Sequence, residues 1–118
     1  MSIFLEIMKE ELERNLLRQR VFKKELDSLP KGYLSICNID GKSYVYRKYR
    51  NGNKIISEYI GVPGDENVLK AEQERNEYLS NKEALKRLKK EELRLRRAID
   101  SYEAIWARIN QSVECLKW

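Results

Sequence analysis

The sequence contains no histidine, and it has only two cysteines and two prolines among its 118 residues. Histidine is the commonest general base and a frequent metal ligand, so its absence removes the usual routes to catalysis and to a Cys/His zinc site. Cys37 and Cys115 lie far apart without a pairing motif, and two cysteines cannot complete a structural zinc site alone. We therefore expect reduced cysteines, no metal and no cofactor.

Other motifs of catalysis and targeting are also missing. The chain has no glycine-rich phosphate loop, no G-x-S-x-G motif and no paired acidic motif in a strand or loop, which predicts a protein that is not an enzyme. No apolar run approaches the roughly 20 residues of a membrane span. Charge interrupts the apolar start Ile3-Phe-Leu-Glu6 too early for a signal peptide. These features predict a cytoplasmic protein without a membrane partner.

Charge is concentrated in one part of the chain. Lysine and arginine number 24 against 19 acidic residues, which gives a net charge of +5. Residues 31–61 hold six basic and two acidic side chains, so this segment accounts for most of the excess, while the flanking segments are close to neutral. A length of 118 residues predicts one domain, residues 1–118, or one small unit with an extension.

The segment from Gly32 to Gly61 predicts three β-strands, near residues 33–39, 43–50 and 54–60. Asp40-Gly41 and Asn51-Gly52 favour tight hairpin turns, because Asn, Asp and Gly reach positive φ at the lowest cost. A two-residue turn at Asp40-Gly41 would place Ile36 opposite Val45 and Leu34 opposite Arg47. The second turn has either two or three loop residues, and this choice decides which face the third strand contributes.

Helical patterns flank these strands. Residues 3–28 carry apolar side chains at steps of three and four, interrupted at Asn15 and Gln19, and Pro30 marks the end of this helix. A heptad pattern runs from Leu85 to Leu116 and is broken only at Glu92, which favours a seam against another helix.

We therefore predict an α+β fold: a long N-terminal helix (1–30), a three-stranded antiparallel β-meander (31–61) and a long, coiled-coil-like C-terminal helix (62–118). The last helix is either continuous or broken at a capping-box pattern near Ser80. A continuous helix would span roughly 80 Å against about 37 Å for the first helix. The first helix therefore cannot cover the whole apolar stripe of the last one. Either the chain breaks near Ser80 and folds back into a three-helix bundle, or the distal half pairs with a second copy, and we favour a homo-oligomer. The expected self-association residues are Leu95, Ile99, Tyr102, Trp106, Ile109, Val113 and Leu116.

The strand segment is also the best candidate for binding. From Gly41 to Ser57 it contains no acidic residue, and its basic side chains alternate with tyrosines. Cations neutralise phosphates, tyrosines stack on bases, and strands can enter a major groove, so nucleic acid is one candidate partner. A protein partner is the other, and a third interpretation is that the cations only protect sheet edges while the tyrosines pack across strands. The candidate binding residues are Lys42, Tyr44, Tyr46, Arg47, Lys48, Arg50 and Lys54.

Three short segments, Leu29-Pro-Lys-Gly32, Lys42–Arg50 and Ser57–Gly61, resemble a hairpin unit of small uncharacterised bacterial proteins, over about 30 residues. With the helix that follows, the strands are also distantly similar to the sheet-type arm-binding domains of phage and transposon integrases. That resemblance implies DNA contacts through the exposed sheet face by Arg47, Lys48 and Arg50 with Tyr44 or Tyr46. The alternative function is a protein-interaction module, such as an antitoxin-like partner or an anti-CRISPR-type inhibitor of a nucleic-acid-handling enzyme.

Overall fold

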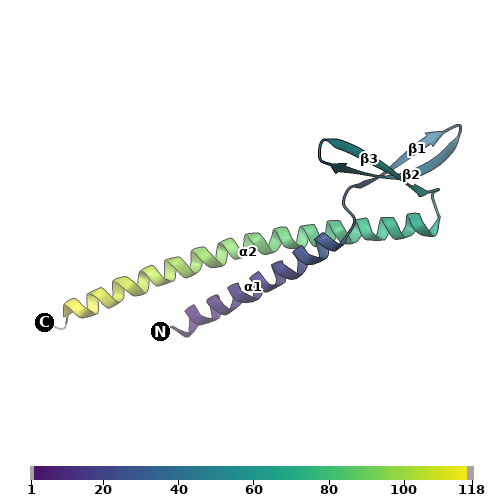
Figure 1. Cartoon of the computed structure of the whole chain (residues 1–118). Helices are drawn as coiled ribbons and strands as arrows, with labels where there is room; N and C mark the ends of the chain where they lie inside the picture. Colours follow the sequence, from purple (N-terminus) through teal and green to yellow (C-terminus); the bar gives the residue numbers. More distant parts are fainter. Residues whose placement is uncertain (1, 117–118) are drawn as a thin grey trace. The chain divides into compact units, whose positions relative to one another are not determined.

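The computed structural model describes the backbone of residues 2–116 and the side chains of residues 2–112. Five elements follow one another: α1 (Ile3–Ser28), β1 (Tyr33–Ile39), β2 (Lys42–Asn51), β3 (Lys54–Gly61) and α2 (Glu66–Leu116) (Figure 1). The predicted α+β class and element order are confirmed. Helix α2 runs through Ser80 without interruption, so the alternative with a break there is wrong.

The contacts divide the chain into two compact units. One unit is Lys24–Glu83, which contains the sheet and the first part of α2. In the other, the first part of α1 packs against α2 from Ala84 onward.

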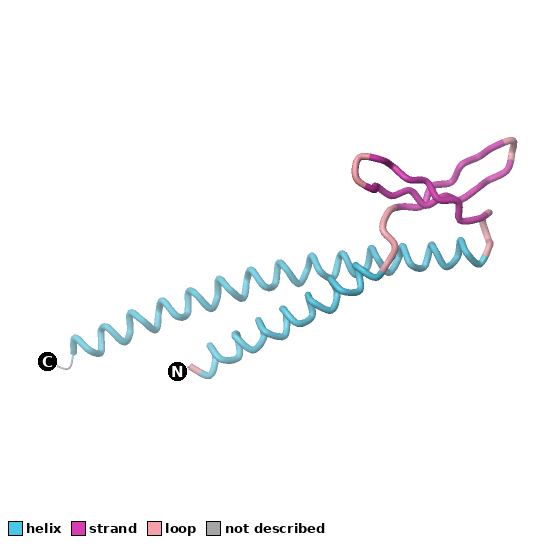
Figure 2. Tube along the Cα trace, in the orientation of Figure 1, coloured by secondary structure: helices cyan, strands magenta, loops and turns pink. Residues whose placement is uncertain are grey.

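The sheet is an antiparallel meander in the order β1-β2-β3 (Figure 2). Ile39 pairs with Lys42, which leaves Asp40 and Gly41 as a two-residue turn with φ of 52° and 79°. Two positive φ values are typical of a type I′ turn, whose twist matches that of the strands. The predicted pairs Ile36 with Val45 and Leu34 with Arg47 are therefore formed.

The second turn differs in detail from its sequence motif. Asn51 pairs with Lys54, so the loop is Gly52-Asn53 and Asn51 belongs to the strand. Gly52 has a φ of 64°, and a glycine at the first central position is typical of a type II′ turn. Two loop residues place Ile55 opposite Arg50 and on the same face. The open choice between two and three residues is thus resolved in favour of two.

The sheet packs against the start of α2 through a small apolar core. Val45 on β2 is 3% exposed, and Val68 and Ala71 on α2 are 1% and 4% exposed. Asp65 directly precedes α2 and connects the start of the helix to the segment before it. Its backbone oxygen accepts a hydrogen bond from the Leu69 N–H at 3.0 Å, and its Oδ2 accepts one from the Val62 N–H at 3.2 Å. These contacts fix which sheet face α2 covers.

Gly32, just before β1, has no room for a side chain. Its φ is 106°, and a Cβ there would lie 2.3 Å from the Lys48 backbone oxygen, which cannot move without disturbing the β1-β2 pairing. We expect Gly32→Ala to lower the free energy of unfolding by roughly 2–4 kcal/mol in chemical denaturation. Gly41→Ala is the matched control, because Gly41 also has positive φ but has open space around it. Equal losses in the two variants would contradict the steric argument.

In the helical unit α1 and α2 are antiparallel. Ser2 at the start of α1 lies beside Tyr102, with 2.8 Å between the hydroxyl oxygens, whereas Asn15 further along α1 reaches back to Leu88. Leu5, Leu88 and Ile99 are the buried apolar side chains among the described residues of this unit.

A polar layer crosses this seam where the apolar patterns of the two helices are interrupted. Asn15 and Gln19 are 2% and 5% exposed. The Asn15 amide donates to the Leu88 carbonyl at 2.9 Å, and the Gln19 amide donates to Asn15 Oδ1 at 2.6 Å and to Glu92 Oε1 at 2.8 Å. Hydrogen bonds from Arg96 and Gln19 lower the pKa of Glu92. The three residues that break the apolar pattern therefore satisfy one another.

Candidate nucleic-acid interface

Strand β2 distributes the predicted binding residues over two faces of the sheet. Successive side chains of a strand point to opposite sides, so the even-numbered and odd-numbered residues of β2 separate. Val45 and Arg47 mark the face that packs against α2. The opposite face holds five of the seven predicted residues: Lys42, Tyr44, Tyr46, Lys48 and Arg50.

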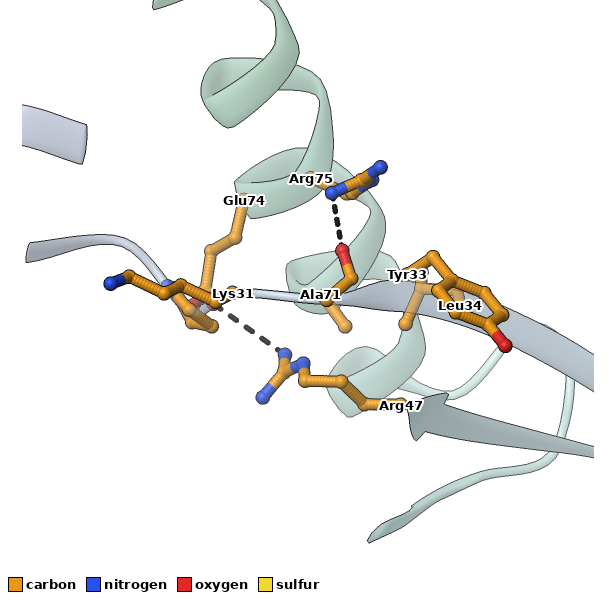
Figure 3. Close-up of a pocket in the computed structure, with 9 residues that line it drawn as sticks. Lys31, Tyr33, Leu34, Arg47, Ala71, Glu74 and Arg75 are labelled. Atoms are coloured by element: carbon orange, nitrogen blue, oxygen red, sulfur yellow. Dashed lines mark hydrogen bonds and ion pairs between the residues drawn. The ribbon is translucent and has the colours of Figure 1, made fainter. Parts of the chain in front are cut away.

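Arg47 belongs to the α2 side, so its predicted place beside Lys48 and Arg50 is wrong. Its Nη2 lies 3.7 Å from Glu74 Oε2, and the two side chains are 19% and 26% exposed (Figure 3). The carboxylate neutralises the guanidinium within the fold. Lys54 pairs with Asn51 and shares the face of Arg47, so it also lies away from the other predicted cations.

A second arginine, Arg75 on α2, binds the backbone just before β1. Its guanidinium donates to the Gly32 carbonyl (Figure 3) and lies 5.5 Å from the centre of the Tyr78 ring. Together with the Arg47–Glu74 pair, this contact fixes the sheet to α2 by charged side chains. Both arginines on this side therefore have a structural role.

The exposed sheet face carries an aromatic cluster that the sequence did not predict in full. Tyr59 on β3 lies between two tyrosines of β2: its ring centre is 6.2 Å from that of Tyr44 and 5.6 Å from that of Tyr46, with tilted or edge-on geometry. Tyr59 is 53% exposed. Its membership of the cluster depends on the register of β3, which the sequence left open.

Two cations, Lys48 and Arg50, follow this tyrosine cluster along the same face of β2. Lys48 lies between Tyr33 on β1 and Ser57 on β3, and Arg50 lies opposite Ile55. Among the described residues no ion pair involves Lys42, Lys48 or Arg50, and no carboxylate occurs at the strand positions of this face. We call these residues the basic face: Tyr33, Lys42, Tyr44, Tyr46, Lys48, Arg50, Ile55, Ser57 and Tyr59.

A polar groove on the other side of the sheet has balanced charge. It lies between β3 and α2, and its lining includes Arg47 and Lys70 together with Glu58 and Glu74. Two cations and two carboxylates give no net attraction for an anion. The basic face is thus the stronger candidate.

The predicted self-association residues also separate into groups. Ile99 is 7% exposed, Leu95 is half-buried, and Tyr102 contacts Ser2 and the Phe4 ring of α1, so these three face α1 of the same chain. Trp106 and Ile109 are 36% and 47% exposed. The side chains of Val113 and Leu116 lie outside the described residues.

Residues 2–112 contain no group of three or more His, Cys, Asp or Glu side chains that could hold a metal ion. Within the described part of the chain, no helix is both long enough and apolar enough to span a membrane. Comparison with protein-family models, curated proteins and solved structures finds no match.

Proposed function

We propose that this protein binds nucleic acid without catalysing a reaction, through the basic face. One observation carries the proposal: three cations that form no ion pair with a described carboxylate lie on the same sheet face as Tyr59, whose ring contacts those of Tyr44 and Tyr46. Lysine and arginine neutralise phosphates, and exposed aromatic rings stack on bases or pack on sugars. The resemblance to integrase arm-binding domains supports the same face.

The separation of the arginines strengthens the argument. Arg47 and Arg75 are engaged by Glu74 and the Gly32 carbonyl, as expected for cations that stabilise a fold. Lys48 and Arg50 make no such ion pair with the described residues, although they lie on the same strand as Arg47. A cationic face kept free of carboxylates favours an external anion, and a nucleic-acid backbone supplies a row of them.

A second candidate function is protein interaction through the same face. Ile55 is 65% exposed and Tyr33 is 52% exposed beside the cations, and exposed apolar and aromatic side chains are typical of protein interfaces. Such a module would use Lys48 and Arg50 against an acidic protein surface, as in the inhibitor alternative.

A titration of fluorescently labelled single-stranded and duplex oligonucleotides by anisotropy tests the proposal. We expect binding at 50 mM salt that weakens steeply as salt rises, because bound cations displace counterions. No measurable binding to either oligonucleotide at 50 mM salt would refute the nucleic-acid function. The protein-interaction candidate would then be tested by capturing partners with the wild-type protein and with a Lys48→Ala, Arg50→Ala variant.

A further inference from the structure

We propose that the C-terminal part of α2 is a docking surface for a second copy of this chain. The surface lies at one end of the helical unit and is defined by Ile3, Phe4 and Ile7 on α1 with Ile105, Trp106 and Ile109 on α2. These six side chains are between 36% and 75% exposed. The inference is independent of what the basic face binds.

The apolar seam of α2 continues beyond the start of α1. Tyr102 meets Ser2 and Phe4 at that start, and the next stripe positions are Trp106 and Ile109, at steps of four and three. Against the described residues of the chain they remain 36% and 47% exposed. A helix that continued the seam would occupy the position that α1 occupies further along α2, and it would run antiparallel to α2.

The accessible surface is large for the mass. The chain exposes 9525 Å². A compact monomer of 14.1 kDa would expose about 6,700 Å² by the usual scaling. The difference of about 2,800 Å² belongs to the chain as a whole, and a standard stable interface needs roughly 800 Å² of it per partner. Burial of the exposed stripe against another chain is therefore compatible with the available surface.

Pattern and charge identify the second copy as the occupant. A two-fold axis across the end of α2 would place a second α2 antiparallel to the first, and this helix carries the same apolar spacing. The segment 100–112 holds two acidic residues and one basic residue, so two copies repel each other little. Nucleic acid is disfavoured at this end for the same reason, since the segment offers only one cation.

Light scattering coupled to size exclusion tests the proposal. We expect wild-type protein at about 100 µM to have a mass near 28 kDa, twice that of one chain. Trp106→Asp with Ile109→Asp should give the monomer mass with an unchanged helical circular dichroism signal. Leu93→Asp is the control, because Leu93 is an equally exposed apolar residue of α2 outside this surface, 50% exposed, and it should leave the mass unchanged.

A charge-complementation experiment then distinguishes a second copy from other occupants. The Trp106→Lys, Ile109→Lys variant should also be monomeric, because like charges would face each other across the interface. Mixing it with the Asp variant should restore the doubled mass, whichever stripe position faces which. A monomeric wild-type protein, or a doubled mass that persists in both double variants, would overturn the proposal.

Discussion

Replacing Lys48 and Arg50 by alanine is expected to reduce oligonucleotide affinity at least tenfold at 50 mM salt. A hydrogen bond to a charged group contributes about 1.5–3 kcal/mol, and 1.4 kcal/mol corresponds to a factor of ten. If Lys42, Lys48 and Arg50 each neutralise one phosphate, the log–log salt slope of the wild type should be about −2 to −3. The double variant should lower its magnitude by between one and two. Anisotropy titrations at several salt concentrations measure both quantities.

Two controls make this prediction specific to the basic face. Lys86→Ala with Lys90→Ala removes the same net charge from exposed positions of α2 and should leave the slope nearly unchanged. Arg47→Ala removes a cation of the same strand from the opposite face, where it pairs with Glu74. It should lower stability, because Glu74 loses its partner, and it should change the slope little. A similar loss of affinity in all three variants would indicate binding by net charge alone and would contradict the assignment.

The sheet shows where sequence reasoning was sufficient and where it was not. Asp40-Gly41 fixed the first hairpin, because the two-residue turn allows one pairing, and the predicted neighbours of Ile36 and Leu34 follow from it. Proximity in the sequence groups Arg47 with Lys48 and Arg50, although alternation along a strand separates odd-numbered from even-numbered residues. Its partner Glu74 comes from another element, and its pairing could not be predicted from local pattern.

Tyr59 and the polar layer required tertiary information. The sheet face on which Tyr59 lies depends on the two-residue loop Gly52-Asn53. Its contact with both Tyr44 and Tyr46 also depends on a β-bulge. Val45 pairs with Gly61 and Tyr46 pairs with Tyr59, so Ile60 is an extra residue in β3. In the sequence, Asn15, Gln19 and Glu92 are only interruptions of two separate apolar stripes. Their meeting follows from the relative register of two antiparallel helices, which periodicity within each helix does not determine.

The polar layer leads to a large expected effect on stability. Asn15→Ala removes the donor to the Leu88 carbonyl and the acceptor of the Gln19 amide at a site that is 2% exposed. Leaving a buried polar group without a partner costs about 1–3 kcal/mol. For a domain of this size 1 kcal/mol corresponds to about 4–8 °C. We expect the melting temperature to fall by roughly 5–15 °C, measured by circular dichroism.

The control for this prediction is Asn76→Ala, which replaces an exposed asparagine within α2. Alanine favours helix over asparagine by a few tenths of a kcal/mol at either site, so Asn76→Ala measures that gain without loss of a buried contact. Replacing Asn15, Gln19 and Glu92 together by leucine should restore stability, because no polar group then remains unpaired in the layer. An Asn15→Ala variant as stable as Asn76→Ala would show that the layer contributes nothing to the pairing of α1 with α2. Recovery in the leucine variant accompanied by mixed masses in light scattering would show that its contribution is to register, since an all-apolar seam accepts more than one alignment.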